Sequence, residues 1–102
     1  MKQIPLSQGR IALVDDDDFD WIANEGLWSA RRHKSGVLYA VRREDRRFIY
    51  MHRQIMELAM PHGIPAGLFI NHKDGNGLNN QRANLEAVTL RENTRHYHAN
   101  RI

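Results

Sequence analysis

Residues 70 to 80 concentrate amide and imidazole groups in a stretch that offers little to bury. The stretch reads INHKDGNGLNN and holds one histidine, His72, with four asparagines and two glycines. Amide oxygens and imidazole nitrogens can hold a hard cation or a phosphate without saturating the site with negative charge. An imidazole also titrates near neutral pH, so His72 needs no large pKa shift to take a proton from water. The stretch therefore predicts a site that holds a hard cation or a phosphate, with an imidazole able to accept a proton.

Two strands and a helix are expected to position this stretch. LFI (68–70) predicts a short buried strand that leads into it, and NLEAVT (84–89) predicts a second strand after it. TLRE (89–92) has the spacing of a capping box, in which a threonine hydroxyl and a glutamate carboxylate each bond the other's backbone N–H. A helix is therefore expected to begin there and to continue through the C-terminal residues.

This arrangement is expected to bring side chains from separate elements into one cleft. Asn71 and His72 would lie at the end of the first strand, and Asn93 would lie in the first turn of the closing helix. Three further asparagines are placed to hold the loop by bonding its backbone: Asn79, Asn80 and Asn84. One set of amides would then bind the ligand, and another would hold the loop.

The first part of the chain predicts short strands and one helix. GRIALV (9–14) is an apolar run that fits a strand, and DDDDFDWIANEG (15–26) predicts a helix with an aspartate cap and Gly26 as its stop. The consecutive aspartates cannot all converge on one ion, because neighbouring side chains point in different directions. We therefore expect them to form a solvated loop and a helix cap.

A basic hairpin and a second helix are expected in the middle of the chain. VLYAVRR (37–43) and RRFIYMHR (46–53) are rich in β-branched and aromatic residues and are separated by Glu44 and Asp45, which suits a hairpin turn. MHRQIMELAM (51–60) then predicts a helix before Pro61. Its expected buried face carries Met51, Ile55 and Leu58.

Positive charge is concentrated in this middle segment. Eight basic and two acidic residues lie between positions 31 and 53, so the segment carries +6 of a total net charge of +3. Such a band is an electrostatic footprint for phosphate, although a solvated surface would give the same composition. The basic residues expected to face nucleic acid are Arg42, Arg43, Arg46, Arg47 and Arg53.

Length and composition narrow the class of protein. At 102 residues the chain is expected to be a single compact domain, and it has no cysteine for a disulfide, a thiolate zinc site or a cysteine nucleophile. The first residues lack the apolar run of a signal peptide, and no stretch approaches a membrane span. We expect a soluble protein of the cytoplasm, which would be the host's if a phage encodes it, with no membrane partner.

The stretch NHKDGNGLNNQRANLEAVTLREN, residues 71 to 93, resembles the HNH endonuclease motif, whose fold is called ββα-metal. It is most similar to the variant found in phage and intron-encoded homing endonucleases. IYMHRQIMEL resembles the strand and helix that precede the motif in those proteins. The opening IPLSQGRIALVDDDDFDWI and the YAVRR…IYMHR block resemble the N-terminal half of small phage HNH proteins.

The resemblance implies an α+β fold with a β-rich N-terminal part that includes short helices. Residues 1–50 would form this basic, DNA-contacting part, and residues 51–102 would form a helix followed by the C-terminal ββα-metal motif. His72 would be the general base, Asn84 the asparagine that holds the loop, and Asn93 a metal ligand. The residue before the histidine is also a ligand and is frequently aspartate, whereas this chain has Asn71. The cofactor would be Mg²⁺ or another divalent cation such as Mn²⁺, bound weakly without DNA because both ligands are neutral.

Further residues are candidates for secondary roles. Arg82 and Arg95 flank the motif and would hold phosphates, and His96 lies one helical turn beyond Asn93. The alternative for His96 is a solvated helix face. Asp74 could assist the reaction, but DGN is also a turn signal. His52 could contact a phosphate or pack beneath the site, and the sequence does not choose between these roles.

Two classes of function follow. The first is a metal-dependent DNA endonuclease that hydrolyses phosphodiester bonds by nicking or by double-strand cleavage, with double-stranded DNA as its partner. One site per chain cuts one strand, so double-strand cleavage would need a homodimer or two encounters. The second is a DNA-binding module that keeps the fold but cuts poorly, since Asn71 replaces a common acidic ligand. Action on RNA, or assistance to a larger nuclease, is a third alternative, and neither the target sequence nor the oligomeric state can be read from the sequence.

Overall fold

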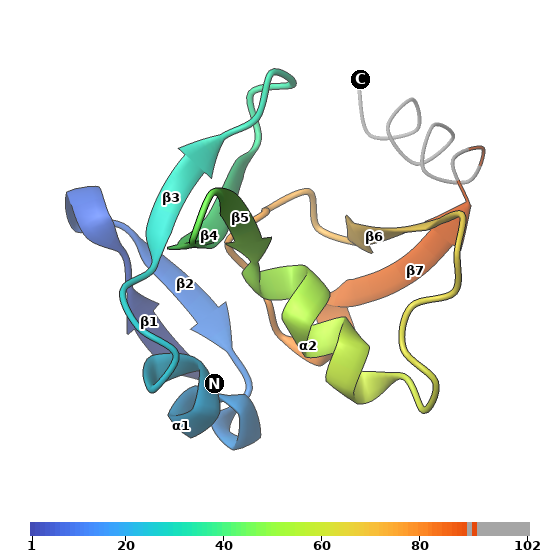
Figure 1. Cartoon of the computed structure of the whole chain (residues 1–102), viewed down its shortest axis with the longest axis horizontal. Helices are drawn as coiled ribbons and strands as arrows, with labels where there is room; N and C mark the ends of the chain where they lie inside the picture. Colours follow the sequence, from blue (N-terminus) through green and yellow to red (C-terminus); the bar gives the residue numbers. More distant parts are fainter. Residues whose placement is uncertain (90, 92–102) are drawn as a thin grey trace.

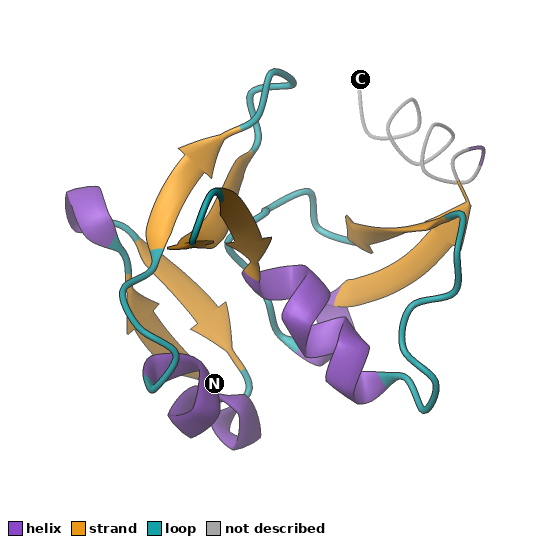
Figure 2. Cartoon of the chain, in the orientation of Figure 1, coloured by secondary structure: helices purple, strands orange, loops and turns teal. Residues whose placement is uncertain are grey.

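Three small antiparallel sheets and two α-helices make up residues 1–89 and 91, the part of the chain that this computed structural model describes (Figures 1 and 2). In chain order the elements are β1 (Lys2–Pro5), β2 (Ile11–Val14), α1 (Asp16–Ala23), β3 (Ser29–Arg32), β4 (Leu38–Glu44), β5 (Arg47–Tyr50), α2 (Met51–Ala59), β6 (Leu68–His72) and β7 (Leu85–Thr89), with 3-10 turns at Ser7–Gly9 and Arg82–Asn84. The expected mixture of helices and strands, an α+β fold, is confirmed. No helix in this part of the chain is long and apolar enough to cross a membrane.

The N-terminal hairpin packs under the first helix. β1 and β2 pair with Ile4 opposite Ala12, and the alternate residues Ala12 and Val14 are fully buried. Ile22 of α1 joins them in the core, and three aspartates occupy the first turn of α1, where the helix dipole favours negative charge. The expected strand and helix are both present, each with narrower bounds.

The middle sheet has β4 at its centre, antiparallel to β3 on one side and to β5 on the other. The turn expected at Glu44 and Asp45 lies one residue later, at Asp45 and Arg46, because Glu44 still pairs with Arg47. Asp45 has a φ of 55°, a left-handed conformation that aspartate tolerates better than a branched residue. The expected hairpin is confirmed with this shift.

Helix α2 begins directly after β5, so the strand expected to run to position 53 ends at Tyr50. The buried face of α2 carries Met51, His52, Ile55 and Met56. Leu58 was expected on this face, but its side chain is 64% exposed. The prediction for Leu58 was wrong. The residues of α2 that pack on the core lie in its first two turns, at positions 51, 52, 55 and 56, so the buried face does not reach position 58.

The last two strands form the hairpin that carries the polar stretch. β6 and β7 pair with Asn71 opposite Glu86 and His72 opposite Leu85. β6 extends past the three residues expected, because the two polar residues still pair with β7. The helix expected from the capping box falls almost entirely outside the described residues. Of the expected ββα motif, the structure therefore describes the two strands and not the helix.

Both halves of the chain contribute to one cluster of buried residues. α2 contacts β4, β5 and β6, and it lies between the N-terminal sheets and the β6–β7 hairpin (Figure 1). The cluster includes Ile4, Leu6, Ala12, Val14, Ile22, Trp28 and Ala40 from the first half and Met51, Ile55, Met56 and Leu85 from the second. The boundary expected near residue 50 therefore does not separate two cores.

Candidate active site

His72 is held by a buried asparagine of the loop that follows it. Its Nε2 lies 2.7 Å from Oδ1 of Asn80, a residue with no exposed surface. An amide oxygen can only accept a hydrogen bond, so Nε2 carries the proton and donates it. Nδ1 is then the unprotonated nitrogen, and it accepts no hydrogen bond from any residue of the described part. Asn80 thus favours the tautomer in which Nδ1 is the unprotonated nitrogen.

Burial keeps His72 neutral. The residue is 5% exposed, and burial lowers its pKa below the ordinary 6.5, while the hydrogen bond to Asn80 and the charge of Asp74 act in the opposite direction. The net pKa is lowered, so the ring is unprotonated at pH 7 and available to accept a proton.

A cluster of rings packs against His72. The ring centroid of His52 lies 5.0 Å from that of His72, and the centroid of Tyr39 lies 5.8 Å away. His52 is buried, and burial, helped by the charges of His72 and Arg53, lowers its pKa to about 3. Its Nδ1 has no hydrogen-bond partner among the described residues. A neutral buried ring fits the packing role for His52 and not the phosphate contact that the sequence also allowed.

Asp74 and Asn84 brace the loop between β6 and β7. Nδ2 of Asn84 donates to Oδ1 of Asp74 and to the carbonyl oxygen of Asn79, both at 2.9 Å, and its Oδ1 accepts from the backbone N–H of Asp74 at 3.1 Å. Burial alone would raise the pKa of Asp74, but hydrogen bonds from Asn79, the backbone of Asn76 and Asn84 lower it below 3.8. Asn84 makes the loop contacts expected of it, and Asp74 acts as their acceptor.

Strand β2 holds the other end of this loop. The backbone N–H of Leu13 donates to the carbonyl oxygen of Leu78 at 2.8 Å, and the N–H of Asn80 donates to the carbonyl oxygen of Leu13 at 2.7 Å. Leu13 and Asn79 form a parallel bridge between the two segments. The place of Asn80, and through it the ring of His72, therefore depends on a strand from the N-terminal half.

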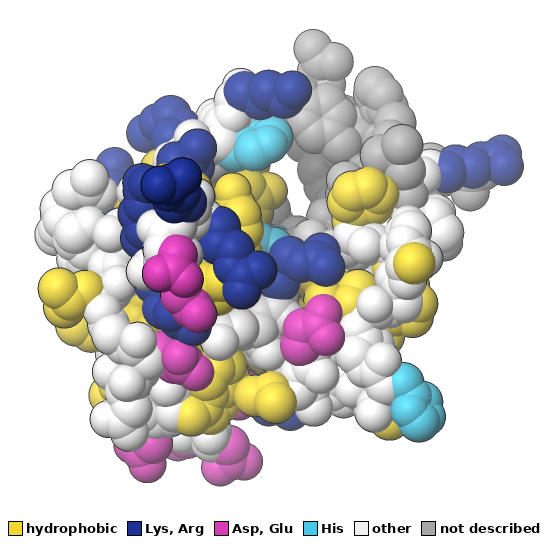
Figure 3. Space-filling model, in the orientation of Figure 1, with side chains coloured by type: hydrophobic (Ala, Val, Ile, Leu, Met, Phe, Trp, Pro, Cys, Tyr) yellow, Lys and Arg dark blue, Asp and Glu magenta, His cyan; other side chains and the backbone are white. Residues whose placement is uncertain are grey.

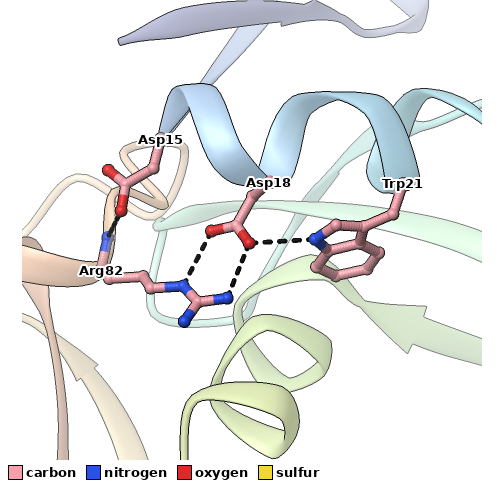
Figure 4. A network of polar contacts seen from close by, with 4 residues as sticks. All are labelled: Asp15, Asp18, Trp21 and Arg82. Atoms are coloured by element: carbon pink, nitrogen blue, oxygen red, sulfur yellow. Dashed lines mark hydrogen bonds and ion pairs between the residues drawn. The ribbon is translucent and has the colours of Figure 1, made fainter.

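An ion pair between a half-exposed arginine and a buried aspartate makes a second link between the halves (Figure 4). Arg82 donates from Nε to Oδ2 of Asp18 at 3.0 Å and from a terminal nitrogen to Oδ1 at 2.8 Å, and the indole of Trp21 donates to the same Oδ1 at 2.9 Å. The backbone N–H of Arg82 also donates to Oδ2 of Asp15 at 3.4 Å. Burial alone would raise the pKa of Asp18, but these hydrogen bonds lower it.

This ion pair corrects two expectations. The aspartates were expected to be solvated, yet Asp18 is 1% exposed, because its helical position faces the core and Arg82 supplies a partner. Arg82 was expected to hold phosphate, yet its guanidinium is occupied by a carboxylate. Its role in the described structure is to fix the loop to α1.

Asn71 pairs across the hairpin with Glu86. Its Nδ2 donates to Oε1 of Glu86 at 2.9 Å, and its Oδ1 accepts no hydrogen bond from a described residue. Asn71 and His72 are consecutive in β6, so their side chains leave the strand on opposite faces. They flank the end of the strand, each with its own partner, rather than lying side by side in one cleft.

The oxygens of Asn71 and Glu86 suit a hard divalent cation, since Mg²⁺ and Mn²⁺ prefer carboxylate, carbonyl and water ligands. Within residues 1–89 and 91, no three His, Cys, Asp or Glu side chains converge as a metal site. The donor set therefore fits a cation held by few protein oxygens, with the remaining ligands coming from substrate and water.

A family model described as HNH endonuclease matches residues 49–95, the span that includes α2, the β6–β7 hairpin and its braced loop. The similarity to HNH endonucleases thus covers 47 of the 102 residues of the chain. The resemblance read from the sequence is thereby confirmed, and the HNH segment lies in the C-terminal half as expected.

One curated relative supports the same assignment for the HNH segment. The chain is 47% identical over 47 residues to the Bacillus subtilis (strain 168) protein named "SPbeta prophage-derived putative HNH homing endonuclease YosQ". The match covers 46% of this chain and 27% of the relative, so the similarity spans only about a quarter of that protein's length. No solved structure matches the chain at a significant level.

Three expected site residues of the HNH segment or its C-terminal side lie outside the described residues: Asn93, Arg95 and His96. Their proposed roles as metal ligand, phosphate contact and accessory group remain predictions.

The basic band lies over the middle sheet, outside the HNH segment for most of its length. Lys and Arg side chains gather over this part of the molecule, with some Asp and Glu side chains beside them and others at the edge of the view near α1 (Figure 3). The guanidinium of Arg31 lies 4.0 Å from the ring centroid of Phe48, and that of Arg43 lies 5.5 Å away. The exposed members of the band include Arg31, Arg32, Lys34, Arg43, Arg46, Arg47 and Arg53.

Arg42 differs from the other arginines of the band. Its side chain is 12% exposed, and it forms ion pairs with Glu25 at 3.0 Å and Glu44 at 2.9 Å. It also lies 5.7 Å from the ring centroid of Trp28. The sequence placed Arg42 among the DNA-facing residues without acidic partners, but the structure gives it two such partners and a structural position.

Three contributions to the HNH site were not found from the sequence. Asn80 was expected to bond the loop backbone, but its side chain holds His72. Glu86 was not considered, because its place opposite Asn71 depends on the strand register across the long loop 73–84, which no local pattern fixes. Asp18 and Arg82 carry no local signal that they would meet, because their contact depends on how the two halves pack.

Proposed function

We propose that the chain is a metal-dependent HNH endonuclease that hydrolyses phosphodiester bonds in double-stranded DNA. The observation that carries the proposal is the hydrogen bond between His72 and Asn80, inside a segment of the HNH family. This bond leaves the lone pair of Nδ1 free on a neutral imidazole, which is the state in which histidine removes a proton from water.

The described residues divide the work of the reaction. His72 takes the proton of the attacking water at Nδ1, while Asn80 stabilises the resulting imidazolium through Nε2. Asn84 and Asp74 keep the loop in the shape that places Asn80. The rings of His52 and Tyr39 exclude water from one side of the base.

Asn71 and Asn93 are the side chains that would hold the cation, each through its amide oxygen. A divalent cation at this place supplies charge to stabilise the phosphate and the departing 3′ oxygen, leaving 5′-phosphate and 3′-hydroxyl ends. The side chains of Asn71 and His72 leave β6 on opposite faces, so the proposal requires the phosphate to lie across the end of the strand, where β6 stops at His72.

The surface of the middle sheet is proposed as the DNA-facing surface. Arg43, Arg46 and Arg47 are exposed near the turn between β4 and β5, and Arg31 and Phe48 extend the same surface toward β3. Arginine contacts phosphate oxygens with several donors, and such contacts set the register of a protein on the duplex.

A plasmid-nicking assay with Mg²⁺, with Mn²⁺ and with chelator tests the proposal. We expect conversion of supercoiled to nicked or linear DNA only with the divalent cation, and we expect His72→Ala to lower the rate by about 10²–10⁴-fold while band-shift binding persists. If nicked plasmid accumulates first and linear plasmid appears only slowly afterwards, the protein cuts one strand in each binding event.

The competing function is a DNA-binding module without cleavage, which the neutral Asn71 favours. Binding of duplex DNA with no cleavage under any divalent cation would establish that function instead. Duplex, single-stranded DNA and RNA substrates tested side by side identify the preferred nucleic acid, and faster cleavage of RNA would overturn the DNA assignment.

A further inference from the structure

Glu86 lies next to Asn71, the candidate metal ligand. Both the charge of Glu86 and its hydrogen bond to Asn71 bear on how a cation would be held. Glu86 lies directly opposite Asn71 in the β6–β7 register, and its Oε1 accepts a hydrogen bond from Nδ2 of Asn71 at 2.9 Å. We propose that Glu86 is a positioning residue for the cation: it orients the amide of Asn71 and supplies the negative charge that Asn71 lacks. This inference rests on the proposed function.

The orientation follows from hydrogen-bond chemistry. A carboxylate can only accept, so the nitrogen of the Asn71 amide must face Glu86, and its oxygen must face the other way. Only the amide oxygen can bind a hard cation. Without Glu86 the amide could turn over and present its N–H groups, which would repel a cation. Residues that orient a metal ligand through hydrogen bonds are a general feature of metal sites.

The charge follows from the composition of the site. A cation bound by the amide oxygen of Asn71 receives no negative charge from that ligand, but Glu86 places a carboxylate one hydrogen bond away from Asn71. The Asn71–Glu86 pair therefore carries the same net charge as an aspartate at position 71. The charge is divided between two facing strands instead of residing on the ligand itself.

The alternative is that the pair only stabilises the hairpin, as cross-strand polar pairs do. The two roles differ in what they do to cation affinity in a protein that remains folded. A hairpin contact changes the unfolding midpoint alone, whereas a positioning role changes the affinity for the cation as well.

The test compares four full-length proteins: the unchanged chain, Glu86→Gln, Glu86→Ala and the double variant Asn71→Asp/Glu86→Gln. Glu86→Gln keeps an acceptor for Asn71 and removes the charge, whereas Glu86→Ala removes both. The double variant moves the charge onto residue 71 and restores the hydrogen bond with its direction reversed. Glu57→Gln, at an exposed position of α2, is the matched control for the loss of one carboxylate.

Two readouts are measured for each protein, after circular dichroism has shown that it is folded. The first is Mn²⁺ affinity, from the electron paramagnetic resonance signal of free Mn²⁺, and the second is the Mg²⁺ concentration that gives half-maximal nicking. We expect Glu86→Gln to weaken both by about 10-fold and Glu86→Ala by up to about 100-fold. The double variant should recover the affinity, and Glu57→Gln should not change it.

The outcomes separate this inference from the proposed function. If the unchanged chain nicks DNA but both Glu86 variants keep its Mn²⁺ affinity and its Mg²⁺ requirement, the inference is overturned and the nuclease assignment stands. If the unchanged chain neither nicks DNA nor binds Mn²⁺, the proposed function fails and the inference fails with it. Loss of affinity in Glu86→Gln without recovery in the double variant would overturn the charge argument.

Discussion

At the scale of single residues, the proton affinity of His72 is set by opposing neighbours. Burial lowers its pKa, and the hydrogen bond to Asn80 and the charge of Asp74 raise it in part. A base must be unprotonated to act, so the lowered pKa extends the active range to pH values below 6.5. Asn80 is the neighbour whose chemistry can be changed with least change in shape.

Asn80→Asp should move the acid limb of the nicking profile to higher pH. A carboxylate in place of the amide still accepts from Nε2 and favours the imidazolium, which raises the pKa of His72 by about one unit. The measurement is the pH dependence of kcat/KM for nicking at a constant metal concentration. Asn24→Asp, which adds the same charge at an exposed position after α1, is the control. An unchanged acid limb in Asn80→Asp would contradict the assignment of His72 as the base.

His52 makes stability depend on pH. Its pKa is about 3 in the fold and about 6.5 in an unfolded chain, so between these values the unfolded chain binds a proton that the folded chain does not. The contribution is therefore complete above pH 6.5 and is lost as the pH falls toward 3. Each pH unit inside this window removes up to about 1.4 kcal/mol of the free energy of unfolding.

His52→Phe should flatten this dependence, since phenylalanine fits among rings and does not titrate. The measurement is the urea midpoint between pH 7 and pH 4.5, with His62→Gln, at an exposed position, as the control. The remaining slope belongs mainly to His72, whose pKa is shifted in the same direction. A slope that His52→Phe leaves unchanged would show that His52 is not the residue responsible.

The proposed role of His72 could be inferred from the sequence, whereas the contact of Asn80 with its ring could not. Histidine beside asparagine in an amide-rich loop already limits the chemistry, and the spacing to Asn84 indicates a family. Four asparagines follow His72 in or just after the loop, at positions 76, 79, 80 and 84. Which of them meets the ring depends on the loop's path along β2, and no local pattern contains that information.

At the scale of elements, the loop after β6 is held by parts of the chain that precede it. Leu13 of β2 bonds Asn80 through the backbone, and Asp18 of α1 binds Arg82. A backbone bond can be removed only by replacing the donor residue with proline, which also restricts the local φ angle, whereas the ion pair can be removed by a change of side chain alone. Its two members differ in exposure: Asp18 is 1% exposed, whereas the side chain of Arg82 is 41% exposed.

Arg82→Ala should therefore cost more stability than Asp18→Asn. Removing Arg82 leaves a buried carboxylate with little compensation, which costs about 3 kcal/mol, whereas an unpaired Arg82 can turn toward water. Urea unfolding of both variants at pH 7 measures the difference. The apolar double variant Asp18→Leu/Arg82→Leu should be more stable than Arg82→Ala, because it leaves no buried charge. Equal losses in the two single variants would contradict this account.

Elements with strong periodicity were predicted, and elements that depend on partners were not. β2, β4, β5, α2, β6 and β7 each have an apolar or helical pattern of their own. β1 contains a proline, and β3 has the sequence SARR, so neither has the pattern of a strand by itself. Both pair with a stronger neighbouring strand, which supplies the order that their own residues do not.

At the scale of the whole molecule, charge is separated between surfaces. Basic side chains gather over the middle sheet, and the acidic first turn of α1 lies toward another part of the molecule (Figure 3). A duplex approaching this surface would meet an attractive potential before any base is contacted. Near the turn between β4 and β5 the band presents three exposed arginines that have no carboxylate partner among the described residues: Arg43, Arg46 and Arg47.

Replacing these three arginines with alanine should weaken duplex binding and lower its dependence on salt. Each lost phosphate contact reduces the slope of log K against log salt concentration by about 0.9. Fluorescence anisotropy with a labelled duplex over a range of salt concentrations gives the slope. Arg42→Ala is the internal comparison: it should lower thermal stability, because Arg42 is paired with Glu25 and Glu44, and should leave the slope nearly unchanged. If Arg42→Ala alone reproduces the triple variant, the DNA-facing surface lies elsewhere.

The backbone bonds between Leu13 and the loop have an evolutionary consequence. The recognisable family segment begins at residue 49, yet the strand that fixes its histidine ends at Val14. A recombination event that transplanted residues 49–95 alone into a new host protein would leave behind the scaffold on which Asn80 rests. Successful exchange must either carry the N-terminal strand along or land where another strand already offers a carbonyl at the same place.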